Sequence, residues 1–275
     1  VKFHDSFYYL KKQAFATVLG IVLMLFVAGM DYHIWQRLAV FGYLAAVALS
    51  VAVMLFGREI NGSKRWLALG PFSFQPSEFA KVALILFLAD LVTKNVKTIG
   101  KMWTLCRIMF WILPIVGLVG ASNLSTAIII LGIGVILIFV ASPKYAQFAL
   151  MGIAGACFMG IFLALESYRL ERLAIWRNPE KYEKGYQTLQ GLYAIGSGGV
   201  FGVGIGNSVQ KLGFVPEAQN DMIFSIICEE LGLAGAGIIV FLFLFLIWRF
   251  FLIASGSRDL FGALIATGAM AHMMT

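Results

Sequence analysis

Apolar runs of about 20 residues recur along most of this chain, and they leave one fold class open. The hydrocarbon core of a bilayer is roughly 30 Å thick and is crossed by a helix of about 20 residues. With 60% hydrophobic residues, the chain has more apolar surface than a soluble domain of 275 residues could bury. Because lipid offers the backbone no hydrogen bonds, the runs must be helical. The sequence therefore predicts an all-α, polytopic membrane helical bundle.

The apolar runs predict eight spans within a single integral membrane domain, 1–275. These spans lie at about 13–30, 37–56, 78–94, 106–121, 125–141, 145–165, 223–250 and 259–275. The chain begins at Val1 and stops inside an apolar run. We therefore expect further spans of the parent protein on either side.

One long polar segment, 166–222, interrupts the apolar pattern. It carries six of the 21 Lys and Arg residues and the densest group of acids in the chain. A loop of this length between spans is usually functional or disordered. Aromatic and aliphatic residues recur near helical spacing from Tyr186 to Ile195, which argues against disorder. We predict a folded, partly helical element outside the membrane that carries functional residues.

The net charge of +7 does not indicate nucleic acid, because the basic residues are spread through short loops between spans. Anionic lipid headgroups or a pyrophosphate match this distribution better. If the spans alternate, 57–77 and 166–222 face the same side. The positive-inside rule alone would put the long loop in the cytoplasm, whereas basic residues that grip an anionic substrate would allow it outside. Charge leaves the orientation open.

The segment 57–81 predicts a hairpin followed by the start of a helix. Asn61-Gly62 is a turn signal, and the alternating stretch after Trp66 favours a short strand or hairpin. Ser77 is placed to cap the helix, and Glu78 in the first turn could pair with Lys81. A capped helix start with a snorkelling lysine is the alternative to a functional role.

Some ionisable residues lie deeper inside the predicted spans, and they are Lys81, Asp90, Glu229 and Glu230. Each would cost roughly 3 kcal/mol or more near the bilayer centre, so we expect them either to face the bundle interior or to lie at a shallow depth in the bilayer. The glutamates either line a cavity with Asp221 or form buried pairs that fix helix packing. The three histidines and three cysteines have no metal-binding spacing, and no metal site is predicted from them.

The glycine-rich run 196–206 contains GxGxG, which a dinucleotide site would place after a strand of a soluble βαβ unit. No such unit is predicted in this sequence. We interpret the run as a bend that lets a short helix dock on the bundle.

Ordered motifs run through nearly the whole chain. They are Asn61-Gly62-Ser63-Lys64-Arg65-Trp66, Gln75-Pro76-Ser77-Glu78-Phe79-Ala80-Lys81, Asn178-Pro179, Gly185-Tyr186-Gln187, Lys211, Pro216-Glu217-Ala218 with Asp221, Phe224 and Glu229-Glu230-Leu231-Gly232. In these motifs the sequence resembles the SEDS family (shape, elongation, division and sporulation) of bacterial cell-wall synthesis. The amino-acid sequence of the long loop is more similar to the division and sporulation branch of the family than to the rod-shape branch.

The resemblance implies a fold of about ten spans in the bacterial cytoplasmic membrane, with the long loop and the active face outside. It implies a peptidoglycan glycosyltransferase that polymerises lipid II beside a class B penicillin-binding protein, with the division septum as a candidate location. The family's essential loop aspartate falls on Asp221, and its intramembrane lysine falls on Lys81. Many relatives have Pro-Asp where this chain has Ser122-Asn123, a difference that frees Lys81 to meet an anion.

Glycan polymerisation joins a sugar hydroxyl to an anomeric carbon whose leaving group is a lipid pyrophosphate. A carboxylate that takes the hydroxyl proton accelerates such a step by about 10² to 10⁴-fold. Asp221, at a junction between loop and helix, is the candidate base, and a single base implies inversion at the sugar. From local sequence alone, Asp221 could equally be a helix N-cap.

Cations aimed at the departing pyrophosphate would stabilise its charge. The candidates are Arg65, Lys81, Arg172 and Lys211, helped by Glu78 beside Lys81 and by a divalent cation (Mg or Mn) near Glu217. For each cation, contact with lipid headgroups is an equally good explanation. Asn178 and Gln187 are candidate sugar-binding amides.

Two other functions fit parts of the sequence. A flippase for lipid II would also use intramembrane charges, but it needs no surface base. A non-catalytic scaffold of a division complex would tolerate substitution of both Asp221 and Lys81.

Overall fold

The computed structural model describes residues 8–60, 63–69, 72–148, 152, 175, 177–182, 185–216 and 218–275. The chain divides into two compact units. Val1–Pro143 and Ile253–Thr275 form the first unit, and Lys144–Leu252 form the second. Among the described residues, five helices are long and apolar enough to cross a membrane, as a polytopic bundle requires.

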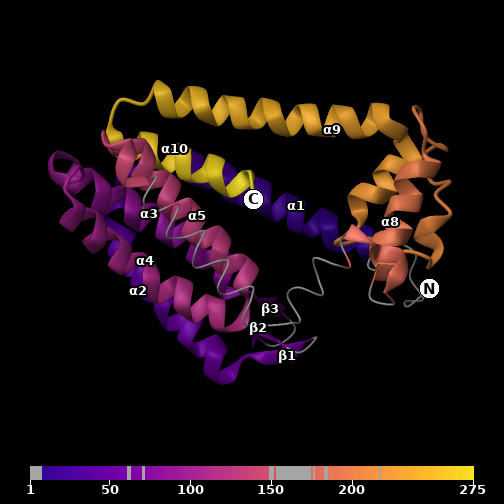
Figure 1. Cartoon of the computed structure of the whole chain (residues 1–275), viewed down its shortest axis with the longest axis horizontal. Helices are drawn as coiled ribbons and strands as arrows, with labels where there is room; N and C mark the ends of the chain where they lie inside the picture. The colour runs from indigo at the N-terminus through magenta and orange to yellow at the C-terminus, as the bar shows by residue number, and fades with distance from the viewer. Residues whose placement is uncertain are drawn as a thin grey trace. The chain divides into compact units, whose positions relative to one another are not determined.

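Within the described ranges, six α-helices belong to the first unit, and Figure 1 shows how they are arranged. Their bounds are Tyr8–Ala28 for α1, His33–Phe56 for α2, Pro76–Asn95 for α3, Met102–Ser122 for α4, Leu124–Ala141 for α5 and Leu260–Met273 for α10. Together with α9 (Ile223–Ser255), a helix lies over each predicted span except 145–165, most of which is outside the described residues. A single 3₁₀ turn, Val96–Thr98, follows α3.

The α3 helix is the centre of the first unit although it carries four charged residues. It packs against α2, α4, α5 and α10, and Figure 1 shows α10 lying alongside α3 and α5. Asp90 is 3% exposed, and its carboxylate accepts hydrogen bonds from Lys94 Nζ at 2.6 Å and Gln36 Nε2 at 3.0 Å. The predicted inward orientation of Lys81 and Asp90 is confirmed, since both side chains are buried.

A three-stranded antiparallel sheet lies at the end of the bundle where α2 stops and α3 begins (Figure 1). Its strands are β1 (Arg58–Ile60), β2 (Ser63–Leu69) and β3 (Phe72–Phe74), in that order. Ile60 pairs with Ser63, so β1 and β2 form the predicted hairpin around residues 61–62, which themselves lie outside the described residues.

The predicted N-cap at Ser77 is wrong. The α3 helix begins one residue earlier, at Pro76, with Gln75 in the extended cap position. Proline lacks an N–H and has φ fixed near −65°, so it suits the first helical position better than an interior one. Ser77 is therefore inside the first turn, where its hydroxyl accepts a hydrogen bond from Gln75 Nε2 at 3.0 Å.

A histidine joins two loops at the opposite end of the first unit. His33 Nδ1 lies 2.8 Å from Asp31 Oδ1, and His33 Nε2 lies 2.9 Å from Asp259 Oδ2. Ionised carboxylates only accept, so both contacts are hydrogen bonds only if both ring nitrogens carry protons. Hydrogen bonds from the His33 backbone and ring hold the pKa of Asp31 below its usual value, so this stabilisation is lost only when pH falls through that lowered pKa.

In the second unit, α8 (Tyr186–Ser197) confirms the predicted helix within the long loop. Short 3₁₀ turns lie at Pro179–Lys181 and Gln210–Leu212. The α9 helix is interrupted at Gly232, where φ is +67° and ψ is −169°.

The interruption at Gly232 frees backbone groups that the glycine-rich run then satisfies. Val203 N and Gly204 N donate to the carbonyls of Glu229 and Glu230, each at 3.0 Å. Leu233 N and Ala234 N donate at 3.0 Å to Gly199 O and Val200 O, respectively. The run therefore docks on α9 through main-chain hydrogen bonds, as part of the bend that the sequence predicts.

Gly232→Ala should destabilise the second unit by roughly 2 kcal/mol or more, because the left-handed φ is strained for alanine. The added Cβ would also lie 2.5 Å from Val200 O. Gly237→Ala is the matched control, since nothing lies within 4 Å of its Cβ position and alanine favours a helix. Thermal unfolding in detergent should separate the two variants, and equal midpoints would contradict the docking role of the bend.

Asp259→Ala should destabilise the first unit by about 1–2 kcal/mol. It removes both the His33 contact and the α10 cap, in which Gly262 N donates to Asp259 Oδ1 at 2.7 Å. Asp259→Asn keeps a capping oxygen while losing the charge, so its loss of stability should be intermediate. If the Asn variant unfolds at the same temperature as the Ala variant, the cap contributes nothing.

Candidate functional site

Asp221 lies two residues before α9, and its side chain is exposed. Within the described part of the chain, its carboxylate has no hydrogen-bond or ion-pair partner, so it does not act as the helix N-cap. The neighbouring residue is firmly held, because Met222 packs on a cluster of Val215, Ala218 and Ile226. The fold thus presents a free carboxylate on an anchored stretch of backbone.

The α8 helix also holds Met222 in place. A Cβ at Gly191 would overlap the Met222 methyl group and would lie 3.2 Å from Ser225 Oγ. Only glycine at this position lets the thioether lie directly against the helix backbone. This contact fixes the chain on the C-terminal side of Asp221.

Lys211, a predicted phosphate-binding cation, pairs with Glu230 of α9 at 2.6 Å. Next to it, Glu229 is 2% exposed and accepts hydrogen bonds from Ser208 Oγ at 2.5 Å and Val209 N at 3.0 Å. Both glutamates therefore fasten residues 208–211 to α9. Of the two alternatives for these acids, the structure favours buried pairing that fixes packing.

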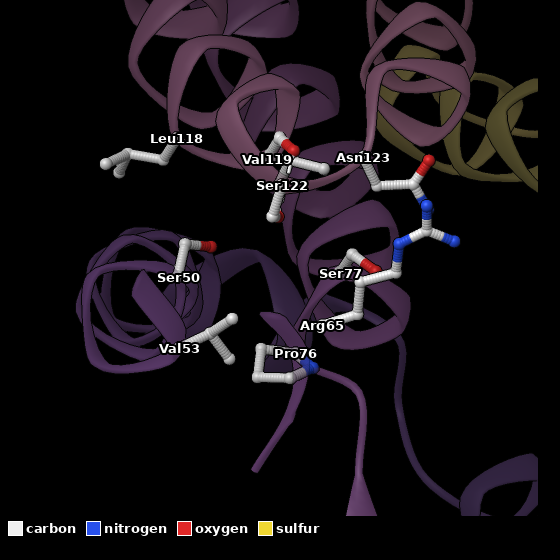
Figure 2. Close-up of a pocket in the computed structure, with 9 residues that line it drawn as sticks. All are labelled: Ser50, Val53, Arg65, Pro76, Ser77, Leu118, Val119, Ser122 and Asn123. Carbon is white, nitrogen blue, oxygen red and sulfur yellow. Dashed lines mark hydrogen bonds between the residues drawn. The ribbon is translucent and has the colours of Figure 1, made fainter. Parts of the chain in front are cut away.

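A small pocket in the first unit lies between the sheet and the adjacent ends of α2, α3 and α4 (Figure 2). Its polar lining comes from Arg65, Ser50, Ser77, Ser122 and Asn123. Figure 2 shows the Arg65 side chain extending toward Asn123. Arg65 was predicted as a site residue, whereas the three serines were not. Ser77 and Ser122 are marked only by their positions at helix ends beside the hairpin, and Ser50, inside α2, has no local signal.

The predicted pair of Glu78 and Lys81 is confirmed, with 2.9 Å between Lys81 Nζ and Glu78 Oε2. The lysine side chain is 10% exposed and the glutamate side chain is 55% exposed. Asn123, at the position of the family's aspartate, instead caps α5 by accepting from Thr126 N at 3.3 Å. Glu78 is therefore the carboxylate that neutralises Lys81.

The remaining predicted site residues belong to the second unit. Asn178 is exposed before the 3₁₀ turn at Pro179, and Gln187 is half-buried in the first turn of α8. Arg172 and Glu217 lie outside the described residues. Among the residues that are described, no group of three His, Cys, Asp or Glu side chains is arranged to hold a metal ion.

The structure thus groups the candidates by unit. Arg65, Glu78 and Lys81 lie at the sheet end of the first unit. Lys211 and Asp221 lie in the second unit, with Asn178 and Gln187. Basic groups and one free carboxylate suit a reaction that moves a proton and releases an anion.

Comparison with known proteins places this chain in a family. The family model for FtsW, RodA and SpoVE, described as a cell cycle protein, matches residues 1–275. Stage V sporulation protein E of Bacillus subtilis is 37% identical, over 97% of this chain and 75% of the relative. A probable peptidoglycan glycosyltransferase FtsW of Saccharophagus degradans is 32% identical, over 97% of this chain and 71% of the relative.

Solved structures agree with these sequence matches. The structure described as "Structural coordination of polymerization and crosslinking by a peptidoglycan synthase complex" has a TM-score of 0.78 and 27% identity, over 96% of this chain and 75% of that one. The rod shape determining protein RodA of Thermus thermophilus has a TM-score of 0.66 and 25% identity, over 96% and 71%. The resemblance to SEDS proteins is thereby confirmed, and this chain belongs to the FtsW/RodA/SpoVE family.

Proposed function

We propose that Asp221 is the general base of a peptidoglycan glycosyltransferase that polymerises lipid II. The glycosyltransferase class is supported by FtsW relatives that bear this name and align with nearly the whole chain. The observation that carries the role of Asp221 is its exposed, unpartnered carboxylate on an anchored backbone. A base must be ionised and open to substrate, and this side chain has the exposure that the role needs.

The proposed step is a displacement at the anomeric carbon of the lipid-linked sugar. The acceptor hydroxyl oxygen forms a bond to that carbon as the bond to the pyrophosphate oxygen breaks. The hydroxyl proton passes to Asp221, and the electron pair of the broken bond leaves with the lipid pyrophosphate. Attack opposite the leaving group inverts the configuration at the sugar.

Cations would stabilise the charge that gathers on the departing pyrophosphate. Lys81 is the best candidate, because it is buried and its only partner among the described residues is the half-exposed Glu78. Arg65 is exposed beside the polar pocket and is the second candidate. Lys211 is partly neutralised by Glu230, so it contributes less than a free lysine would.

The other substrate contacts stay predictions. They are sugar contacts by Asn178 and Gln187, a phosphate contact by Arg172, and a divalent cation beside Glu217. No step of the reaction is assigned to a metal. Among the described residues, no cluster supplies three metal ligands.

This chain is a multi-pass membrane protein, and we place its active face outside the cytoplasmic membrane, at the division septum. A class B penicillin-binding protein is the proposed partner. Support comes from the related structure whose description joins polymerisation and crosslinking in one peptidoglycan synthase complex. A polymerase that works outside needs such a partner because glycan strands still have to be cross-linked.

A lipid II flippase and a division scaffold are the competing functions. A flippase needs a path across the bilayer but no exposed base, so loss of the Asp221 carboxylate should leave its transport intact. A scaffold needs only its binding surfaces. The relatives named peptidoglycan glycosyltransferase support the enzyme, and the exposed carboxylate of Asp221 is open to a substrate, as a general base must be.

Asp221→Ala and Asp221→Asn should lower polymerisation by about 10² to 10⁴-fold, because the hydroxyl proton then has no acceptor. The assay uses the intact protein, alone and with its penicillin-binding partner, supplied with labelled lipid II. Thermal stability should not change, since the carboxylate has no partner among the described residues. Glu180→Gln, which removes another exposed carboxylate of the same unit, is the control and should keep the normal rate. Glycan strands made at the normal rate by the Asp221→Ala variant would contradict the proposal.

Lys211→Met and Glu230→Gln should each destabilise the protein, and the double variant should recover about 1 kcal/mol of coupling. The reason is the 2.6 Å ion pair between side chains that are 32% and 17% exposed. Chemical unfolding of all four proteins measures the coupling. A KM for lipid II that stays high in the double variant would support an additional phosphate contact by Lys211, and zero coupling would contradict the structural role of the pair.

A further inference from the structure

The α3 and α10 helices run antiparallel and touch closely at one point. A Cβ at Gly268 would overlap Ile85 Cγ2 and would lie 3.1 Å from Ile85 Cγ1. The Ile85 side chain therefore packs directly against the α10 backbone at Gly268. One turn back from Ile85 on α3 is Lys81, and one turn on from Gly268 on α10 is His272. Antiparallel packing therefore brings His272 beside Lys81, at the sheet end of the first unit.

The electrostatic surroundings of His272 agree with this placement. Its ring lies within Coulombic range of both Lys81 and Glu78. Its Nδ1 atom is buried and has no hydrogen-bond partner among the described residues. A buried ring nitrogen without a partner is costly, and native proteins rarely leave one unsatisfied unless a ligand, an ion or water meets it.

The Glu78–Lys81 pair beside His272 can open to a ligand. Lys81 is held inside the bundle, whereas the Glu78 side chain is 55% exposed and is free to turn into solvent once another anion neutralises the buried lysine. An incoming anion would then replace the carboxylate at Lys81 Nζ. A phosphate carries several oxygens, so one could take the place of the carboxylate at Lys81 while a second extends toward the His272 ring, which lies within Coulombic range of both side chains.

We propose that His272 is a further substrate-binding residue, and that its Nδ1–H donates a hydrogen bond to a phosphate oxygen of the lipid pyrophosphate that Lys81 holds. This inference rests on the proposed function and deepens it. Phosphate fits better than a sugar hydroxyl because it brings the negative charge that Lys81 lacks once Glu78 turns away. In the tautomer with the proton on Nδ1, this buried atom is a hydrogen-bond donor. A phosphate oxygen accepts from it directly, whereas a sugar hydroxyl group accepts only when its own hydrogen points elsewhere.

The test exploits the shapes of two amides. The side-chain nitrogen of asparagine can occupy the place of histidine Nδ1, and that of glutamine reaches only toward Nε2. His272→Leu should raise KM for lipid II by about tenfold or more with kcat changed less than threefold, because a hydrogen bond to a charged group is lost. His272→Asn should return KM to within about threefold of the original value, and His272→Gln should resemble the leucine variant. Met273→Leu, at an exposed neighbouring position, is the control.

Binding provides a second measurement that does not depend on turnover. In the intact protein carrying Asp221→Ala, undecaprenyl pyrophosphate should bind about tenfold more weakly after His272→Leu, and His272→Asn should restore binding. Undecaprenyl monophosphate and inorganic pyrophosphate, added separately, distinguish a lipid-linked ligand from free phosphate.

Equal affinity of the Leu, Asn and original proteins would overturn the proposal. So would equal weakening by Leu and Asn with a lowered unfolding temperature, which indicates packing alone. If no form polymerises lipid II, the proposed function fails while the binding result still decides the role of His272.

Discussion

Charge pairing on α3 is the constraint on which the first unit depends. A helix with charged residues can occupy the centre of a membrane bundle only if each charge has a partner. Asp90 meets Lys94 and Gln36 at one end of the helix, and Lys81 meets Glu78 at the other. The two pairs differ in exposure, because Asp90 is enclosed whereas Glu78 is largely in solvent. The first pair therefore fixes the bundle, and the second leaves a buried cation whose partner is open to solvent.

In the second unit, specific contacts keep an irregular loop ordered. A long loop loses conformational entropy when it is ordered, so it needs specific contacts to offset that cost. Main-chain hydrogen bonds at the Gly232 bend, buried acceptors on Glu229 and the packing of Met222 on Gly191 supply them. All three lie within α9 or next to its start, so one helix anchors the glycine-rich run and the residue beside Asp221.

Much of the candidate site was predictable because it is local. The pair of Glu78 and Lys81 follows from helical spacing, and the hairpin follows from the turn signal at 61–62. The cap at Ser77 was predicted wrongly because serine and proline compete for the start of a helix, and the fixed φ of Pro76 decided it. The contact of Lys211 with Glu230 joins residues 19 positions apart, and no local pattern predicts it.

The sequence by itself determined the fold class and the candidate chemistry, since the length of apolar runs and the few charges within them allow only a helical membrane bundle. It also singled out Asp221 and Lys81, because each lies in a short run of neighbouring residues that resembles a motif of the SEDS family. Only the tertiary structure decided that Glu230 pairs with Lys211, that the Asp221 carboxylate stays exposed, and that His272 lies near Lys81. These outcomes depend on contacts between distant helices, because packing and hydrogen bonding across the fold decide whether a side chain has a partner.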